Sequence, residues 1–282
     1  MTFLEFNLPL GLKILRELPI PRKLGLLERL YGRKLAKAGV CWVNTAEGPV
    51  WKLDLSDSCD RWVVFGDYEG SVQMNWIRKW LKPGGLVVDS GTYYGQMLLY
   101  FANLPNIQVL GFEPQPEARE WVKICLDRNK FRNVQIEPVA LAAMTGTARL
   151  RMDGPRSTIR DDWYPDSKLD EIEVDVKRLD NVLDQRGLKK VRLWKLDVEG
   201  FELSALEGAR QSLTSSIIDC VLFETNAERV AGFHQFFDSV AYEIFQITRK
   251  GLKPLVFLKS NWFGNLVAIP RQNPPTNLLQ NG

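Results

Sequence analysis

The chain has 282 residues, of which 45% are hydrophobic and 25% are charged, and its formal net charge is +3. This is the composition of an ordinary globular protein, long enough for one large domain or for one domain with an appendage. The small net charge favours no particular partner and gives no reason to expect a nucleic-acid-binding protein.

The chain is also not expected to be a membrane-spanning or a secreted protein. The chain contains no uncharged apolar run of about 18 residues, so no transmembrane helix is expected. Its N-terminus lacks the basic segment and apolar core of a signal peptide. The four scattered cysteines form no C-x-x-C pair and show no metal-ligand spacing, which predicts reduced thiols in a cytoplasmic protein.

A basic arm opens the chain. Residues 1–40 carry eight Lys or Arg and three Glu, a local charge of +5 that leaves −2 for the remainder. Apolar residues recur there at helical spacing, namely Leu24, Leu27, Leu30 and Tyr31. Such a stripe more often docks on its own domain, with the charges on a solvated face. The alternative is that residues 1–39 lie on an anionic membrane as a peripheral contact.

A hairpin and a helix are expected to follow the arm. The predicted strands are Val40–Val43 and Val50–Leu53, and the helix is Met74–Leu81, stopped by Pro83-Gly84-Gly85. Residues 1–82 are therefore predicted to form an N-terminal helical and hairpin extension.

From residue 83 onward, predicted strands alternate with predicted helices. The strands are Leu86–Gly91, Gln108–Glu113, Val134–Val139, Val191–Leu196 and Ile217–Phe223, and the helices are Gln96–Asn103, Glu117–Asn129, Leu179–Gln185, Glu202–Leu213 and Arg229–Val240. This alternation predicts a mostly parallel sheet with right-handed crossovers and helices on both faces. We therefore expect one α/β, Rossmann-like domain over residues 83–270.

Some segments do not fit this alternation. Ala148–Met152 and Glu171–Lys177 alternate like paired strands around a long polar loop, Asp153–Asp170. Closing strands are predicted at Tyr242–Thr248, Leu255–Leu258 and Leu266–Ile269, and residues 271–282 are predicted to be a flexible tail. His234, the only histidine, lies among phenylalanines of a predicted helix, so it is expected to pack rather than to catalyse.

The turn after the first of these strands predicts a ligand site. It reads Asp89-Ser90-Gly91-Thr92-Tyr93-Tyr94-Gly95 and is followed by an apolar helix, the opening unit of a nucleotide-binding fold. A dinucleotide site needs G-x-G-x-x-G to seat a pyrophosphate, and this turn lacks the middle glycine. Glu113 ends the next strand, where an acid can accept hydrogen bonds from both ribose hydroxyls.

A cofactor that has a ribose but no phosphate fits this turn best, and S-adenosylmethionine is the common one. Two alternatives remain open. One is a nicotinamide cofactor, which would make the protein an oxidoreductase, and the other is a tight turn that binds nothing.

The densest polar cluster follows the fourth strand of the alternating region. It reads Lys195-Leu196-Asp197-Val198-Glu199-Gly200-Phe201-Glu202. Because side chains alternate along a strand, Lys195 and Asp197 should share one face. They could act in catalysis, or form a structural salt bridge while Glu199 and Glu202 cap the next helix. Carboxylates alone could hold Mg²⁺, but three acids without histidines are a weak signal, and no metal site is predicted.

Together these motifs resemble the FkbM-type methyltransferases over roughly residues 66–270. The resemblance rests on Gly66-Asp67-Tyr68-Glu69, the Asp89–Gly95 turn, Gly111-Phe112-Glu113-Pro114, Leu179-Asp180, the Lys195–Glu202 segment and Leu222-Phe223-Glu224. It implies a Rossmann-like class I methyltransferase fold and S-adenosylmethionine-dependent O-methylation, often of sugar or polyketide hydroxyls. Family members usually carry A-N-I where this chain has Thr92-Tyr93-Tyr94.

The resemblance also implies roles for individual residues. Cofactor contacts are assigned to Asp89, Ser90, Gly91, Gly95, Glu113, Pro114 and Ala140, and the reaction site to Lys195, Asp197 and Glu199. The acceptor hydroxyl must lose a proton during methyl transfer. We interpret Asp197 as the base and Lys195 as a neighbour that favours the deprotonated alcohol.

The acceptor is expected to be a sugar, a glycolipid or another small hydroxylated molecule. Trp163 and Tyr164 of the Asp153–Asp170 loop could stack on a sugar ring while polar neighbours meet its hydroxyls. A mobile surface loop is the alternative. The other remaining hypothesis for the whole protein is a non-catalytic, membrane-associated binding module.

Overall fold

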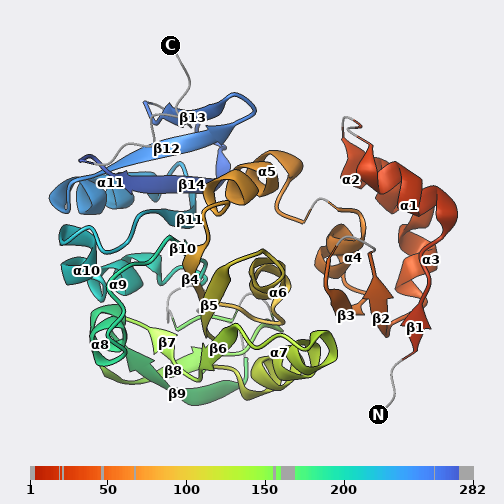
Figure 1. The fold of residues 1–282 in the computed structure, drawn as a ribbon, viewed down its shortest axis with the longest axis horizontal. Helices are drawn as coiled ribbons and strands as arrows, with labels where there is room; N and C mark the ends of the chain where they lie inside the picture. Colours follow the sequence, from red (N-terminus) through yellow and green to blue (C-terminus); the bar gives the residue numbers. More distant parts are fainter. Residues whose placement is uncertain are drawn as a thin grey trace.

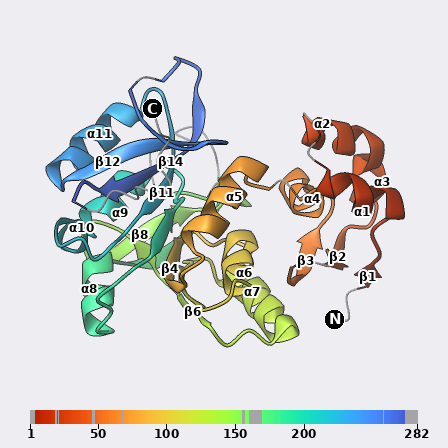
Figure 2. The same ribbon diagram turned by 45° about the horizontal axis from the view of Figure 1, so that its top comes forward.

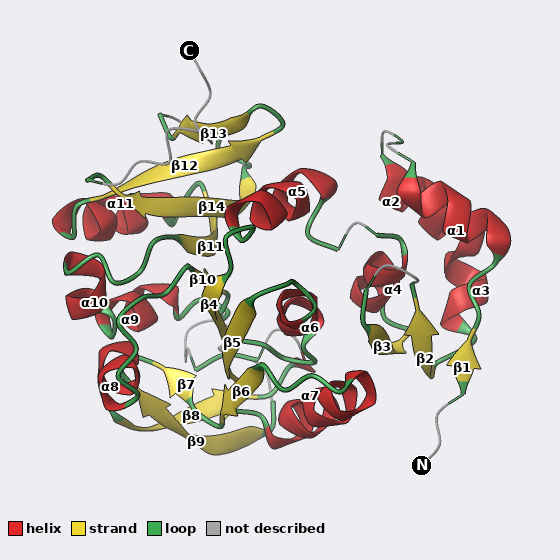
Figure 3. Ribbon diagram, in the orientation of Figure 1, coloured by secondary structure: helices red, strands yellow, loops and turns green. Residues whose placement is uncertain are grey.

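The computed structural model describes residues 4–18, 20, 22–45, 48–66, 68–154, 157–159, 169–256 and 258–272. Figure 1 shows a larger unit built on one wide sheet and a smaller N-terminal unit beside it. Figure 3 shows that both units combine helices with strands. Most of the predicted tail, from residue 273 onward, lies outside the described residues.

The N-terminal unit packs helices on a three-stranded sheet. Its strands are β1 (Glu5–Phe6), β2 (Val40–Asn44) and β3 (Val50–Asp54), and its helices are α1 (Leu10–Glu17), α2 (Lys23–Leu27), the π-helical η1 (Glu28–Gly32), α3 (Arg33–Ala36) and α4 (Ser58–Val64). β2 and β3 are antiparallel, which confirms the predicted hairpin, and β1 pairs in parallel with β2. The Asp57 carboxylate caps α4 by accepting a hydrogen bond from the Cys59 N–H.

An eight-stranded sheet organises the larger unit. Its spatial order is β13 (Gly251–Pro254), β12 (Tyr242–Thr248), β14 (Phe263–Pro270), β11 (Val221–Asn226), β10 (Leu193–Leu196), β4 (Gly85–Ser90), β5 (Ile107–Phe112) and β6 (Val134–Glu137). The strands from β11 to β6 are parallel, whereas β14 is antiparallel to both of its neighbours. The chain runs from β4 outward to β6 and then returns to the other side of β4 for β10 and β11. Ligands of open α/β sheets bind at such a reversal, beyond the carboxyl ends of the strands.

Helices cover both faces of this sheet, as Figure 2 shows. One face carries α5 (Ser71–Trp80), α6 (Gln96–Ala102) and α7 (Pro116–Asn129), and the other carries α8 (Leu179–Gln185), α9 (Glu202–Glu207), α10 (Arg210–Thr214) and α11 (Val230–Ser239). Neighbouring strand residues enter opposite cores: Val87 lies in the first and Val88 in the second. The predicted α/β, Rossmann-like fold is confirmed. Of the helices that the structure describes, none combines the length and apolar character of a bilayer-spanning segment.

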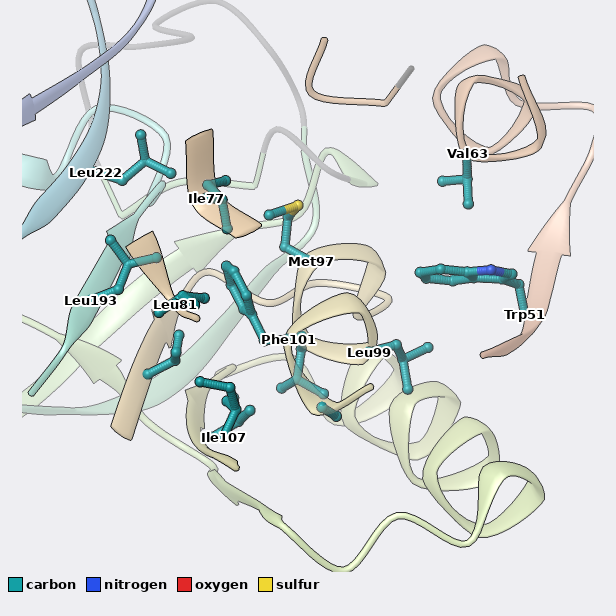
Figure 4. Close-up of a cluster of buried hydrophobic side chains, with 14 of the residues drawn as sticks. Trp51, Val63, Ile77, Leu81, Met97, Leu99, Phe101, Ile107, Leu193 and Leu222 are labelled. Atoms are coloured by element: carbon teal, nitrogen blue, oxygen red, sulfur yellow. The ribbon is translucent and has the colours of Figure 1, made fainter. Parts of the chain in front are cut away.

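The first core continues from the sheet into the N-terminal unit. Figure 4 shows this junction through side chains of the sheet, of α6 and of the hairpin, namely Leu193, Leu222, Met97, Leu99, Phe101 and Trp51. Leu27 and Leu35 of the arm belong to the same core and are fully buried. The arm therefore docks on its own domain through one side, whereas Leu30 of the predicted stripe is exposed.

A small third sheet follows β6 along the chain. It consists of β7 (Ala140–Leu141), β9 (Glu171–Lys177) and β8 (Gly146–Arg151), in that spatial order. β8 and β9 are antiparallel, which confirms the predicted strand pair. Residues 155–156 and 160–168 of the connecting loop lie outside the described residues, and Trp163 and Tyr164 are among them.

The predicted helix Glu202–Leu213 is wrong in its length. It is two helices, because α9 ends at Glu207 and α10 begins at Arg210. Gly208 lies between them, and a Cβ added there would stand 2.1 Å from the Ala142 carbonyl oxygen. Ala142, the residue after β7, therefore approaches the chain closely at the point where α9 and α10 are separated. No periodicity in the sequence predicts this contact.

Two predicted strands are also displaced. The closing strand expected at Leu255–Leu258 is wrong, since β13 lies earlier and pairs with β12 across a tight turn, with Gly251 opposite Thr248. The strand expected from Ile217 begins only at Val221, and Ile218 makes an isolated bridge. In both cases the strand limits follow the hydrogen-bonding partner rather than the apolar run.

Candidate active site

A cavity of about 740 Å³ lies at the carboxyl ends of β4, β5, β10 and β11. Its wall includes nine of the predicted site residues: Asp89, Ser90, Gly91, Glu113, Pro114, Ala140, Lys195, Asp197 and Glu199. Its volume is within the range of roughly 300–1,000 Å³ that small-molecule and cofactor sites occupy. The structure therefore brings residues of three separate sequence motifs, together with Ala140, into one wall at the reversal of the sheet.

Gly91 holds the turn after β4 directly against the loop after β10. Its φ is +78°, and an added Cβ would lie 1.8 Å from the Asp197 carbonyl oxygen. The Asp197 N–H also donates a hydrogen bond to the Ser90 carbonyl at 3.2 Å. Only glycine combines this left-handed conformation with such a close approach. Gly91 thus sets the spacing between the predicted cofactor turn and the predicted reaction site.

Asp89 ends β4 as a buried carboxyl group, with 1% of its surface exposed. In the strand register it stands beside Lys195 of β10. Neither of its oxygens accepts a hydrogen bond from any described residue. Burial raises the pKa of Asp89 to about 7, although Lys195 opposes this rise. A buried carboxyl without a donor is unfavourable, so this position suits a ligand that brings a hydrogen-bond donor or a positive charge.

Glu113, at the end of β5, is held in place by the main chain. Its Oε2 accepts a hydrogen bond from the Tyr93 N–H at 2.7 Å, and its Oε1 accepts one from the Gln115 N–H at 2.9 Å. Burial raises the pKa of Glu113 to about 7, although these two hydrogen bonds lower it. Each oxygen retains a second acceptor site, so the oriented carboxylate can also accept hydrogen bonds from two ligand hydroxyls.

Ser90 and Gly95 have packing roles at the turn. The Ser90 hydroxyl accepts a hydrogen bond from Trp194 Nε1 at 2.8 Å. The structure does not place Gly95 in the cavity wall. Its φ is +85°, and an added Cβ would lie 2.9 Å from Val122, so Gly95 allows α6 to begin close to α7. The prediction that Gly95 contacts a cofactor therefore receives no support from its position.

Lys195 is the only Lys or Arg among the described residues of the cavity wall. Its Nζ donates a hydrogen bond to Asp197 Oδ2 at 2.8 Å, and the Lys195 and Asp197 side chains are 6% and 32% exposed. Burial by itself lowers the pKa of Lys195, but Asp197, Glu69 and Asp89 raise it well above its usual value. Lys195 is therefore a stable cation, and the carboxylate of Asp197 beside it reaches the cavity.

Glu69 and Glu224 also line the cavity, although neither is among the predicted site residues. Glu69 precedes α5 and accepts hydrogen bonds from Gln73 Nε2 at 2.9 Å and Asn265 Nδ2 at 3.2 Å. Burial first, and then Asp197, raise the pKa of Glu224 to about 8. Glu224 follows the predicted strand Ile217–Phe223, and this position at a strand's carboxyl end predicts it at the ligand edge of the sheet, as it does for Asp89 and Glu113. Glu69 lies before the alternating strands and helices, so the only sequence signal for it is the resemblance of residues 66–69 to a family motif.

Tyr93 and Tyr94 replace smaller family residues and form part of an aromatic stack. The ring centroids of Tyr93 and Tyr94 are 4.0 Å apart, and those of Tyr94 and Trp121 are 4.4 Å apart. Lys52 Nζ lies 3.6 Å from the centroid of the Trp121 ring. The stack joins the turn to α7 and to β3, while Tyr93 also lines the cavity. The substitution therefore anchors this turn to the N-terminal unit.

Glu199 and Glu202 have different roles, and the N–H groups that Glu202 binds lie in the loop before α9 rather than in the helix. Glu202 Oε1 accepts hydrogen bonds from the N–H groups of Val198 and Gly200, at 3.2 Å and 3.0 Å. Glu199 instead lines the cavity, and its φ is +47°. Its carbonyl accepts a hydrogen bond from Thr158 Oγ1 at 2.6 Å. The described part of the polar loop thus contacts the predicted reaction site.

The single histidine lies apart from this site. His234 is exposed on α11 and is absent from the described cavity wall, so its expected packing role is wrong. All four cysteines are free thiols. Among the residues that the structure describes, no group of three or more His, Cys, Asp or Glu is arranged to hold a metal ion.

Comparison with known proteins identifies relatives of the chain. The family model "Methyltransferase FkbM domain" matches residues 89–244. "Methyltransferase 1" of Beauveria bassiana is 31% identical over 142 residues, which cover 43% of this chain and 57% of that protein. The 31-O-demethyl-FK506 methyltransferase FkbM of Streptomyces tacrolimicus is 26% identical over 164 residues, which cover 47% of this chain and 62% of that protein. The chain thus spans about 57% to 62% of the length of these two relatives.

The chain also aligns with solved structures at low sequence identity. The precorrin-6y C5,15-methyltransferase of Geobacter metallireducens aligns with a TM-score of 0.40 at 10% identity, over 68% of this chain and 84% of that chain.

The family match covers more than half of the chain, from Asp89 at the end of β4 to Ile244 in β12. It includes the Asp89–Gly95 turn, Glu113 and the Lys195–Glu202 segment. The match favours methyl transfer over the nicotinamide-dependent alternative. On this basis the chain belongs to the FkbM methyltransferase domain family.

Proposed function

We propose that the protein transfers the methyl group of S-adenosylmethionine to a hydroxyl of a neutral small acceptor, such as a sugar or a glycolipid. The observation that carries this proposal is the single cavity wall shared by Asp89, Glu113 and the Lys195–Asp197 pair. The relative FkbM is named for methylation of 31-O-demethyl-FK506, which supports an oxygen acceptor.

The residues of the wall fit this cofactor. Asp89 offers two buried oxygens without a donor from the described chain, which suits the cofactor's ammonium group. Glu113 is oriented by two N–H groups and suits the ribose hydroxyls. Lys195 is the only described cation of the wall and is paired with Asp197, as expected for a ligand without phosphates. When bound, the cofactor supplies a methyl group on a positively charged sulfur.

Glu113→Ala should weaken the binding of S-adenosylmethionine by about 1.5–3 kcal/mol, or roughly 10- to 150-fold, because charge-assisted hydrogen bonds to the ribose are lost. Titration calorimetry measures this directly. Glu117→Ala is the matched control, since Glu117 is an exposed acid of α7 outside the cavity wall. Equal affinities for the Glu113→Ala variant and the unaltered protein would remove Glu113 from the site.

Asp197 is the proposed base for the acceptor hydroxyl. A proton must leave that hydroxyl as the new carbon–oxygen bond forms. The Lys195 ammonium, 2.8 Å from Asp197 Oδ2, can stabilise the negative charge that develops on the acceptor oxygen. Glu224 is a weaker candidate because its pKa is raised to about 8, which leaves it mostly protonated at neutral pH.

The charge of the cavity wall supports an acceptor without negative charge. The wall contains one lysine and eight acidic residues: Asp57, Glu69, Asp89, Glu113, Asp153, Asp197, Glu199 and Glu224. Glu224 is mostly protonated at neutral pH, but the other acids still outnumber the lysine, so a phosphate or carboxylate on the acceptor would meet a net charge of its own sign. Neutral hydroxyls can instead donate hydrogen bonds to carboxylates. This balance supports a neutral polyhydroxylated acceptor over a sugar phosphate or a nucleotide-sugar.

We expect methyl transfer to neutral sugars or glycolipids, with kcat/KM at least roughly tenfold higher than for the phosphorylated form of the same acceptor, because one repelled charge costs about 1.4 kcal/mol or more. Transfer from methyl-labelled S-adenosylmethionine, read by mass spectrometry, measures this. The same instrument can first detect the cofactor or its demethylated product in the purified protein. A strict preference for a phosphorylated, carboxylate, protein or nucleic-acid acceptor would overturn the proposed acceptor class.

A further inference from the structure

The outward side of the N-terminal helices is apolar to an unusual degree for an exposed surface. Nine large apolar side chains are exposed among the described residues, and six of them lie within residues 4–30: Leu4, Leu10, Ile14, Leu18, Leu26 and Leu30. Figure 1 places α1, α2 and α3 along one outer edge of the molecule. We call the exposed side of residues 4–37 the arm face.

The helices of the arm are apolar on two sides. In α1, Leu12 is fully buried, whereas Leu10 and Ile14, one turn apart, are 74% and 55% exposed. The following helices repeat this arrangement, with Leu27 and Leu35 buried and Leu26 and Leu30 exposed. A helix that only docks on its own domain needs a single apolar stripe. The second stripe is therefore exposed to solvent in the described part of the chain.

Cations accompany the exposed leucines. The same helices and their ends expose six basic side chains: Lys13, Arg22, Arg29, Arg33, Lys34 and Lys37. The three acids of the arm pair elsewhere, Glu5 with Arg128, Glu17 with Arg16 and Glu28 with Arg61. No described acid forms an ion pair with any of the six cations. The arm face thus combines an apolar surface with an uncompensated positive charge.

We propose that the arm face docks on an anionic lipid bilayer, with its leucines at the level of the headgroups and its cations against lipid phosphates. Protein interfaces are enriched in aromatic residues and Arg and depleted in Lys. The described arm face differs from such an interface in two of these respects, because it exposes three lysines and no aromatic residue. This chemistry favours lipid over a protein partner. The inference is independent of the proposed methyl transfer.

Co-sedimentation of the full chain with vesicles tests this inference. We expect binding to phosphatidylcholine vesicles that contain phosphatidylglycerol, weak binding to phosphatidylcholine alone, and release at high salt. Arg29→Gln with Arg33→Gln should lower the partition coefficient about fivefold per charge. Leu10→Ser with Ile14→Ser should lower it at least roughly tenfold, because exposed apolar area can no longer leave water.

Matched variants on other surfaces provide the controls. Met144→Ser with Val256→Ser removes exposed apolar residues elsewhere, and Lys79→Gln with Lys123→Gln removes exposed cations elsewhere. Both pairs should bind vesicles as the unaltered protein does. Equal binding to the two kinds of vesicle, or unchanged binding of the arm variants, would overturn the proposal. It would also be overturned by a concentration-dependent dimer that Leu10→Ser with Ile14→Ser abolishes, in the absence of vesicle binding.

Discussion

Asp197→Asn should lower kcat for methyl transfer by about 10²- to 10⁴-fold, because asparagine keeps the size of the side chain but cannot accept the acceptor's proton. The affinity for S-adenosylmethionine should stay within a few fold. Asparagine can still accept a hydrogen bond from Lys195, which preserves the local geometry. Initial rates at saturating acceptor and cofactor, together with calorimetry for cofactor binding, measure the two quantities separately.

Glu224→Gln is the matched control for this substitution. Glu224 and Asp197 line the same cavity, but the pKa of Glu224 is raised to about 8, so glutamine imitates its predominant neutral form at pH 7. Its activity at pH 7 should therefore stay within a few fold of the unaltered protein. Above pH 8 Glu224 becomes negatively charged in the unaltered protein, whereas the glutamine of the variant stays neutral. The pH profiles of activity of the two proteins should therefore differ above pH 8. If Glu224→Gln were inactive and Asp197→Asn were active, Glu224 and not Asp197 would be the base.

Gly91→Ala should lower the free energy of unfolding by about 2–5 kcal/mol, the combined cost of a left-handed alanine and of overpacking. The added Cβ would lie 1.8 Å from the Asp197 carbonyl oxygen, so the turn or the loop after β10 must move. This movement separates the two halves of the candidate site, and cofactor binding and kcat should both fall. Urea unfolding measures the stability change, and calorimetry measures cofactor binding.

Gly187→Ala is the control for Gly91→Ala, because it introduces backbone strain without a steric clash. Gly187 also has a positive φ, +65°, but an added Cβ there would meet nothing within 4 Å. This substitution should cost only about 1–2 kcal/mol of stability and leave methyl transfer intact. If Gly91→Ala were no more destabilising than Gly187→Ala, the contact between the turn and Asp197 would not constrain the fold.

Features that depend on near neighbours in the chain could be predicted from the sequence. The succession of strand, glycine turn and helix from β4 to α6 needs only local periodicity and two glycines. The pairing of Lys195 with Asp197 follows from the alternation of side chains along one strand. Strand-end acids such as Asp89 and Glu113 meet in one cavity because parallel strands share a carboxyl edge. The family resemblance combined these local signals, and the family match confirmed it.

The sequence by itself therefore determined the α/β class, the family and most of the predicted residues that share the cavity wall, because each has a signal within a few consecutive residues. Only the tertiary structure decided features made by segments far apart in the chain. Glu69 lines the cavity and accepts a hydrogen bond from Asn265, which is 196 residues away in the chain. Gly95 lies close to Val122 of α7 and outside the described cavity wall, and Leu30 faces solvent although its periodicity suggested a docked stripe. No local pattern encodes such contacts, because they depend on how whole elements pack.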